Sequence, residues 1–325
     1  MKKIVTIDSP ARIHLGFLET NENSHRKFGS IGLGISHYKN IFKIEHSKKK
    51  EVICNNKNLE KKIFKILDIF SKYKKISNCK ITVNENIPFH KGLGSGTQHS
   101  LSAGFLISEF NNFKLSIEQI SKLLNRGRRS GAGIEIFKSG GFIIDLGKKK
   151  NSNRLPLKIF EYKWPKEWKI ILIQDEKFCG LHGQDENKEF KKIKKINNSF
   201  VQENCFATMM HILPGIIEND FKNFIRGVSI IQKNMSKIFY GKSNLYASKN
   251  ITKIFNYLDF YGYSGYGQSS WGPTGFVFCE NNRSSLKLCK DIQNYIELKK
   301  IKGINLRIVD GRNKGKIKKV RIEND

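Results

Sequence analysis

Lys91-Gly92-Leu93-Gly94-Ser95-Gly96-Thr97-Gln98 is the most informative stretch of this sequence of 325 residues. It follows Ile87-Pro88 directly, and the apolar pattern after it predicts a helix over residues 98–110. Closely spaced glycines let backbone N–H groups and a helix N-terminus face an anion, which is the arrangement that a phosphate group needs. The spacing fits neither a Walker loop nor a dinucleotide fingerprint. We therefore predict a phosphate-binding loop of another type; the alternative is a glycine-rich turn with only a structural role.

A second informative stretch is Arg126-Gly127-Arg128-Arg129-Ser130-Gly131-Ala132-Gly133. It holds three of the 11 arginines of the chain, although 48 of the 59 basic residues are lysines. Arginine offers a planar fork of donors that binds carboxylate or phosphate through two hydrogen bonds, which lysine cannot do. The cluster therefore predicts an anion-binding site. The alternative is a helix C-terminus with complementary cations and Gly127 as terminator, and both can hold together.

Two further stretches carry candidate residues. Pro10-Ala11-Arg12-Ile13-His14-Leu15-Gly16 places Arg12 and His14 on one face of an extended segment. The glycine-rich segment 262–275 places Ser269, Ser270, Trp271 and Thr274 just before a predicted strand, where they suit a pocket wall. The alternatives are a structural histidine and a tryptophan that anchors the core. Neither the histidines nor the six cysteines show metal-ligand spacing, so we expect no dedicated zinc or iron site.

Composition restricts the class of protein. The formal net charge of +30 would suit a nucleic-acid partner, but the lysine runs are dispersed between predicted elements, so we expect a solvated surface. No segment is apolar for the roughly 18 residues that a membrane span requires, and no signal peptide is evident. We therefore expect a cytoplasmic protein with reduced thiols, without a membrane or nucleic-acid partner.

Residue patterns predict an α+β protein of two domains, residues 1–150 and 151–325. Alternating or β-branched segments predict strands at 4–7, 41–45, 80–84, 142–146, 168–174, 275–279 and 305–309. Helical spacing or a capping box predicts helices at 59–70, 98–110 and 116–124, and mostly helices over 199–258.

These segments, in this order, resemble the GHMP-kinase superfamily, whose three motifs match Pro10-Ala11-Arg12, the glycine loop and the late glycine-rich stretch. Within it the chain looks most like the β-ribofuranosylaminobenzene 5′-phosphate synthases, also called β-ribofuranosylphenol phosphate synthases. The resemblance rests on four blocks: Gly92-Leu-Gly-Ser-Gly-Thr-Gln98, Gly127-Arg-Arg-Ser-Gly131, Gly140-Gly-Phe142 with Asp145, and Ser269-Ser-Trp-Gly-Pro-Thr274.

The resemblance implies a GHMP-kinase-like fold with the ligand between two domains. It also implies condensation of 5-phosphoribosyl 1-diphosphate with 4-hydroxybenzoate or 4-aminobenzoate to a C-riboside 5′-phosphate, with loss of carbon dioxide and diphosphate, as in methanopterin biosynthesis. Magnesium is expected with the diphosphate, its protein ligands remain unassigned, and a homodimer is possible. The alternative is an ATP-dependent small-molecule kinase of the same superfamily. Many such kinases carry an Asp after a Ser-Gly pair, whereas Ala132-Gly133 follows Ser130-Gly131 here.

The candidate residues follow from these stretches. The catalytic candidates are Arg12, His14, Arg128, Arg129 and Asp145. The substrate-binding candidates are Gly92, Gly94, Ser95, Gly96, Thr97, Gln98, Arg126, Ser130, Ser269, Ser270, Trp271 and Thr274. Arg12 or His14 is expected to grip the benzoate or accept the phenol proton, and Asp145 either orients magnesium or closes a strand end. The identity of a general base stays open.

Overall fold

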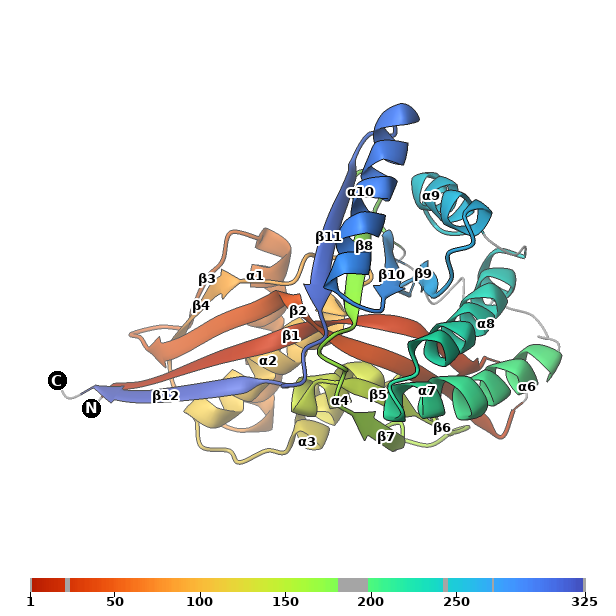
Figure 1. Cartoon of the computed structure of the whole chain (residues 1–325). Helices are drawn as coiled ribbons and strands as arrows, with labels where there is room; N and C mark the ends of the chain where they lie inside the picture. The colour runs from red at the N-terminus through yellow and green to blue at the C-terminus, as the bar shows by residue number, and fades with distance from the viewer. Residues whose placement is uncertain (1, 21–23, 181–197, 242–244, 271, 324–325) are drawn as a thin grey trace.

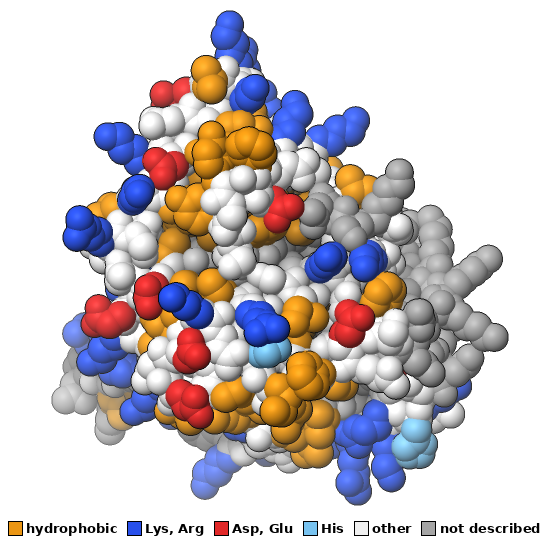
Figure 2. All heavy atoms as spheres, turned by 45° about the vertical axis from the view of Figure 1, so that its right-hand side comes forward, with side chains coloured by type: hydrophobic (Ala, Val, Ile, Leu, Met, Phe, Trp, Pro, Cys, Tyr) orange, Lys and Arg blue, Asp and Glu red, His pale blue; other side chains and the backbone are white. Residues whose placement is uncertain are grey.

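The computed structural model describes residues 2–20, 24–180, 198–241, 245–270 and 272–323. These residues form two sheets with helices packed against them, which confirms the α+β class (Figure 1). None of the described helices is long and apolar enough to span a bilayer. On the face seen in Figure 2, the described Lys and Arg side chains are scattered among other types and form no continuous stripe.

The first sheet is built around two long strands, β1 (Lys2–Glu19) and β2 (Arg26–His46), which pair antiparallel. Its order is β12-β1-β2-β4-β3, and β5, β6 and β7 extend it beside β2. The remaining bounds are β3 (Glu51–Ile53), β4 (Cys79–Glu85), β5 (Phe142–Asp145), β6 (Lys148–Lys149), β7 (Lys158–Tyr162) and β12 (Ile317–Glu323). In Figure 1, β12 lies alongside β1, so the two ends of the chain come together.

Four helices belong to this first half: α1 (Lys57–Tyr73), α2 (Ser95–Phe110), α3 (Ile117–Leu123) and α4 (Ala132–Ser139). The predicted spacing of α1 is confirmed, because it buries one apolar face made by Leu59, Ile63, Ile66, Leu67 and Phe70. The predicted capping box of α3, between Ser116 and Gln119, is present too. The helix after the glycine loop begins at Ser95, three residues earlier than predicted, because Gly94 ends the loop in a left-handed conformation.

The second sheet has the order β11-β8-β10-β9, with all neighbours antiparallel. Its strands are β8 (Lys169–Asp175), β9 (Tyr266–Gln268), β10 (Thr274–Cys279) and β11 (Ile304–Asp310). The helices are α6 (Asn198–Ala207), the π-helix η1 (Thr208–Ile212), α7 (Leu213–Ile217), α8 (Phe221–Tyr240), α9 (Lys249–Phe260) and α10 (Asn282–Leu298). The strands predicted in the second half and the helical character of residues 199–258 are thus confirmed, within the part that the structure describes.

The division of the two sheets differs from the predicted ranges 1–150 and 151–325. Both β7 and β12 lie beyond residue 150, yet β7 pairs with β5 and β12 pairs with β1 in the first sheet. Their backbones satisfy edges of that sheet that residues 1–150 leave open. One apolar cluster also spans both halves: Ile13 and Leu33 share it with Phe224 and Phe276. The two sheets therefore pack on a common core, at which the candidate residues gather.

Candidate active site

The glycine loop ends at a helix N-terminus without a side-chain cap. Gly94 has φ 78°, and its carbonyl accepts the N–H groups of Thr97 and Gln98 at 3.1 Å. The N–H groups of Ser95 and Gly96 have no acceptor among the described residues, and the first turn of α2 contains no acidic residue. A helix of 16 residues thus presents free donors and the positive end of its dipole. This geometry is what the predicted phosphate-binding loop requires.

The other end of the loop is held between the two halves of the chain. Its Gly92 carbonyl accepts hydrogen bonds from Arg12 Nη1 and from Ser269 Oγ, each at 2.7 Å. The Lys91 carbonyl accepts from Thr274 Oγ1 at 2.5 Å, and the Lys91 ammonium donates to the carbonyls of Asp175, Glu176 and Phe178. The structure therefore brings together the segment that contains Arg12, the glycine loop and the glycine-rich segment 262–275, with Thr274 supporting the loop.

The arginine cluster meets the loop only in part. Arg126 Nη1 lies 4.0 Å from where a Cβ on Gly96 would stand, so this guanidinium lies beside Gly96. Arg128 is exposed, and its Nε donates to Asn125 Oδ1 at 2.7 Å. Arg129 is half-buried. Contacts of the described residues thus place Arg126 at the loop, whereas the roles predicted for Arg128 and Arg129 remain predictions.

The Ser130-Gly131 turn is held by a buried carboxylate. Asp145 is fully buried; one oxygen accepts from Ser30 Oγ and from Gly131 N–H, and the other accepts from Gly147 N–H at 2.8 Å. Ser30 Oγ also lies 2.6 Å from Ser130 Oγ. Burial raises the pKa of Asp145 to about 6, although these donors oppose the rise. The arrangement favours closure of a strand end over a magnesium ligand, because both oxygens are engaged.

We expect stability to depend on pH through Asp145. Its pKa is about 6 in the fold and near 3.8 in the unfolded chain, so the group favours the fold fully below pH 3.8. That contribution, about 3 kcal/mol, is lost as pH rises through 6. Urea unfolding of the wild type and of Asp145→Asn from pH 4 to 7.5 measures this as a change in the stability difference between them. A difference that stays constant over that range would show that Asp145 does not titrate as proposed.

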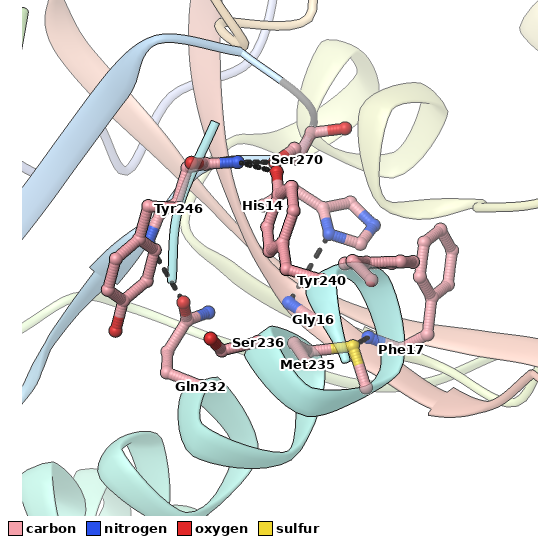
Figure 3. A pocket seen from close by; sticks show the side chains of 11 residues that line it. His14, Gly16, Phe17, Gln232, Met235, Ser236, Tyr240, Tyr246 and Ser270 are labelled. Carbon is pink, nitrogen blue, oxygen red and sulfur yellow. Dashed lines mark hydrogen bonds between the residues drawn. The ribbon is translucent and has the colours of Figure 1, made fainter. Parts of the chain in front are cut away.

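Next to the loop lies a narrow cavity between β1, α8 and the segment after β9 (Figure 3). Its walls are mostly aromatic or apolar, with a few polar groups among them. They are formed by His14, Gly16, Phe17, Gln232, Met235, Ser236, Phe239, Tyr240, Tyr246, Gln268 and Ser270. Burial raises the pKa of Tyr240 and of Tyr246, so both phenols stay neutral. Its volume of about 20 Å³ admits only a single water molecule, so an aromatic ring would enter only if these walls moved apart.

His14 lines this cavity, and one nitrogen of its ring lacks a hydrogen-bond partner among the described residues. Its backbone N–H donates to Ser269 Oγ at 2.9 Å, which links the cavity to the glycine loop. Burial, and then the nearby Arg12 charge, lower its pKa well below 6.5, so the ring is neutral. The Gly16 N–H donates to Nδ1 at 3.3 Å, which leaves the ring proton on Nε2. The buried Nε2 has no partner among the described residues, so it needs an acceptor such as a ligand oxygen.

Three placements complete the comparison with the predicted site. Gln98 is buried, and its Nε2 donates to the Gly133 carbonyl at 2.7 Å, so it joins α2 to α4. Trp271 lies outside the described residues. Lys62 of α1, which sequence reasoning missed, donates from Nζ to the Gly96 carbonyl at 2.6 Å. Nothing in the sequence distinguishes it from the other lysines, because only the packing of α1 on α2 brings it to the loop.

Known proteins share this fold. Residues 58–141, which contain most of α1 and all of the glycine loop, match the GHMP kinases N terminal domain. The chain is similar in structure to the homoserine kinase from Cytophaga hutchinsonii, with a TM-score of 0.66 over 97% of both chains and 13% sequence identity. This confirms the predicted two-domain GHMP-kinase fold.

Sequence relatives are more specific. The chain is 30% identical over 306 residues to β-ribofuranosylphenol 5′-phosphate synthase of Methanocaldococcus jannaschii, covering 84% of this chain and 88% of that protein. It is 28% identical over 286 residues to the enzyme of the same name from Methanothermobacter thermautotrophicus, covering 82% of this chain and 86% of that one. Similarity of this extent confirms the predicted resemblance, and the chain belongs to the β-ribofuranosylphenol 5′-phosphate synthase family.

Proposed function

We propose that this chain joins 5-phosphoribosyl 1-diphosphate to 4-hydroxybenzoate or 4-aminobenzoate and forms a C-riboside 5′-phosphate. Carbon dioxide and diphosphate are the other products. The proposal rests on one observation: the glycine loop and the aromatic cavity lie next to each other. Ser269 hydrogen-bonds both to Gly92 in the glycine loop and to His14 in the aromatic cavity. A phosphorylated sugar and an aromatic ring bound in these two places would be neighbours.

The residues support each stage of the reaction. The bond from the anomeric carbon to diphosphate breaks, and its electron pair leaves with the diphosphate, whose charge the α2 N-terminus and Arg126 stabilise. The ring carbon that bears the carboxylate donates a π electron pair to the anomeric carbon. Carbon dioxide then leaves, and the electron pair of its bond restores the aromatic ring. His14 Nε2–H, an unmet donor at the cavity, fits the carboxylate or the para oxygen.

This sequence of steps involves no net proton transfer, and the identity of any general base stays open. Many kinases of this fold carry an Asp shortly after a Ser-Gly pair, whereas Ala132-Gly133 follows Ser130-Gly131 in this chain. The kinase alternative rests on similarity at the level of the superfamily, whereas the relatives that match more than 80% of this chain carry the synthase name.

Magnesium is proposed as a companion of the substrate's diphosphate. The described residues contain no group of three His, Cys, Asp or Glu side chains that could hold a metal ion, and both oxygens of Asp145 accept hydrogen bonds from the protein. The steps above therefore use only protein groups, and the protein ligands of magnesium stay unassigned. Magnesium commonly binds substrate phosphates with few protein ligands.

We also propose a cytoplasmic location and keep the homodimer as an expectation of the resemblance. Six free cysteines suit a reducing compartment.

The reaction has a direct test. We expect purified protein with magnesium, 5-phosphoribosyl 1-diphosphate and carboxyl-labelled 4-hydroxybenzoate or 4-aminobenzoate to release labelled carbon dioxide and diphosphate in equal amounts. Neither product should appear without the other, because the bare benzoate has no electron-accepting carbon to attack. Parallel assays with the two benzoates identify the para substituent. Consumption of ATP, or a riboside that keeps its carboxylate, would contradict the proposal.

A further inference from the structure

A second cavity, here called the outer cavity, lies between α8, α9 and β9 and has a volume of about 180 Å³. Gln232 and Tyr246 line both this cavity and the narrow one that contains His14, here called the inner cavity, so they form the wall between the two. Cavities of about 150 Å³ can bind benzene. The outer cavity is therefore large enough for an aromatic ring, which the inner cavity is not.

Hydrogen bonds between its walls hold the outer cavity in shape. The Gly265 N–H donates to Ser229 Oγ at 2.9 Å, which joins the turn before β9 to α8. The Tyr266 hydroxyl donates to Asp259 Oδ1 at 3.1 Å, which joins β9 to α9. The three elements are thus fixed to one another around the cavity.

Tyr246 offers the outer cavity an unused hydrogen-bonding group. The residue is only 8% exposed, and its hydroxyl has no hydrogen-bond partner within the described part of the chain. Figure 3 shows this hydroxyl pointing away from His14, on the side of Gln232 that faces away from the inner cavity. Burial raises the pKa of Tyr246, so the hydroxyl keeps its proton and can donate it. Buried hydroxyls normally have a partner, so a ligand oxygen in the outer cavity would satisfy this one.

The other lining side chains define the chemistry of the ligand. Lys233 of α8 brings an ammonium that forms no ion pair among the described residues, and Asp259 of α9 brings a carboxylate. A simple anion would be repelled by Asp259, and a simple cation by Lys233. A ligand with a negative group at one end and a hydrogen-bond donor at the other satisfies both. The rings of Tyr246, Tyr263 and Tyr266 suit an aromatic body between those two ends.

We propose that the outer cavity binds the para-substituted benzoate before it reaches the inner cavity. The carboxylate of the benzoate pairs with Lys233, and its para hydroxyl or amine donates to Asp259. The proposal rests on the proposed function, which supplies the identity of the ligand. Lys233 and Asp259 are then binding residues that take no part in the chemical steps, and a benzoate held here is separated from the inner cavity by Gln232 and Tyr246 alone.

The test is an NMR titration of the protein, without 5-phosphoribosyl 1-diphosphate, with three ligands: 4-aminobenzoate, benzoate without a para group, and aniline without a carboxylate. We expect Lys233→Met to bind 4-aminobenzoate and benzoate about tenfold more weakly and aniline as wild type does. Asp259→Ala should bind 4-aminobenzoate and aniline about tenfold more weakly and benzoate no more weakly than wild type. Lys222→Met is the matched control, because Lys222 is another exposed lysine of α8 that does not line the cavity.

Steady-state kinetics give a second readout. In both variants the KM for the benzoate should rise about tenfold, whereas kcat and the KM for 5-phosphoribosyl 1-diphosphate stay unchanged. Wild-type affinity for 4-aminobenzoate in either variant, at the wild-type melting temperature, would overturn the proposal. So would a wild-type protein that binds none of the three ligands without the sugar substrate. The proposed reaction fails separately: an absence of labelled carbon dioxide, with benzoate binding that depends on Lys233 and Asp259, would refute the reaction and leave the site standing.

Discussion

Replacement of Gly92 by alanine is expected to lower stability and abolish most activity. Gly92 has φ 80°, and an added Cβ would lie 2.3 Å from the Ser269 carbonyl oxygen and 3.1 Å from the Gly272 Cα. Both neighbours are backbone and cannot turn aside, so the loop must separate from the segment after β9. Left-handed strain of about 1 to 2 kcal/mol and overpacking of about 1 to 3 kcal/mol add to one another. We expect a loss of about 3 kcal/mol in unfolding free energy.

The Gly92→Ala variant should also lose activity, because the carbonyl of Gly92 accepts hydrogen bonds from both Arg12 and Ser269. We expect kcat/KM to fall about 100-fold, which equals about 2.7 kcal/mol of transition-state stabilisation. Gly262→Ala is the matched control: its φ is 72°, but nothing lies within 4 Å of the added Cβ. It should show the backbone strain alone and keep its activity. Equal losses in both variants would mean that the contact with Ser269 is unimportant.

Replacement of Gly96 by valine is expected to weaken substrate binding without lowering the stability of the fold. The added side chain would occupy the free space between α2 and Arg126, where the phosphate is proposed to lie. Because Gly96 lies in the first turn of a helix without a positive φ, valine costs the fold little and relieves the entropy penalty of glycine. We expect the affinity for 5-phosphoribosyl 1-diphosphate to fall about 100-fold, near 2.7 kcal/mol, with an unchanged or slightly higher melting temperature.

A second helical glycine provides the control for this variant. An added Cβ on Gly133 in α4 would meet the Thr97 side chain at 3.4 Å, an ordinary contact. Gly133→Ala should therefore gain similar helix stability without loss of affinity. Calorimetric titration of both variants with 5-phosphoribosyl 1-diphosphate measures the two affinities. Unchanged affinity in Gly96→Val would show that the glycine loop is only a turn, which was the alternative left open by the sequence.

The fold was largely predictable because its signals are local. The helical spacing in α1, the capping box at Ser116 and the glycines before α2 each depend on residues close in sequence, and the structure contains all three features. The domain ranges 1–150 and 151–325 stay a prediction; the sequence did not predict the pairing of β12 with β1, which joins segments about 300 residues apart. No local pattern in β12 identifies its partner strand.

The candidate site was predictable where unusual residues stand out. Glycines at 92, 94 and 96 and an arginine at 126 contrast with the lysine-rich background, and the structure places them together. Lys62 could not be predicted, since it is one of 48 lysines and lies 29 residues before Lys91, where the loop begins. The cavity walls from α8, such as Met235 and Tyr240, look like ordinary residues of an amphipathic helix.

The pairing of β12 with β1 has a consequence for biosynthesis. During translation β1 is made first, but its outer edge stays unpaired until residues 317–323 leave the ribosome. At about 5 to 20 residues per second, that interval lasts on the order of 15 to 60 s. An open strand edge is a template for pairing with other chains. The nascent protein therefore passes through a stage in which chaperones that cover exposed strands would raise the yield of folded enzyme.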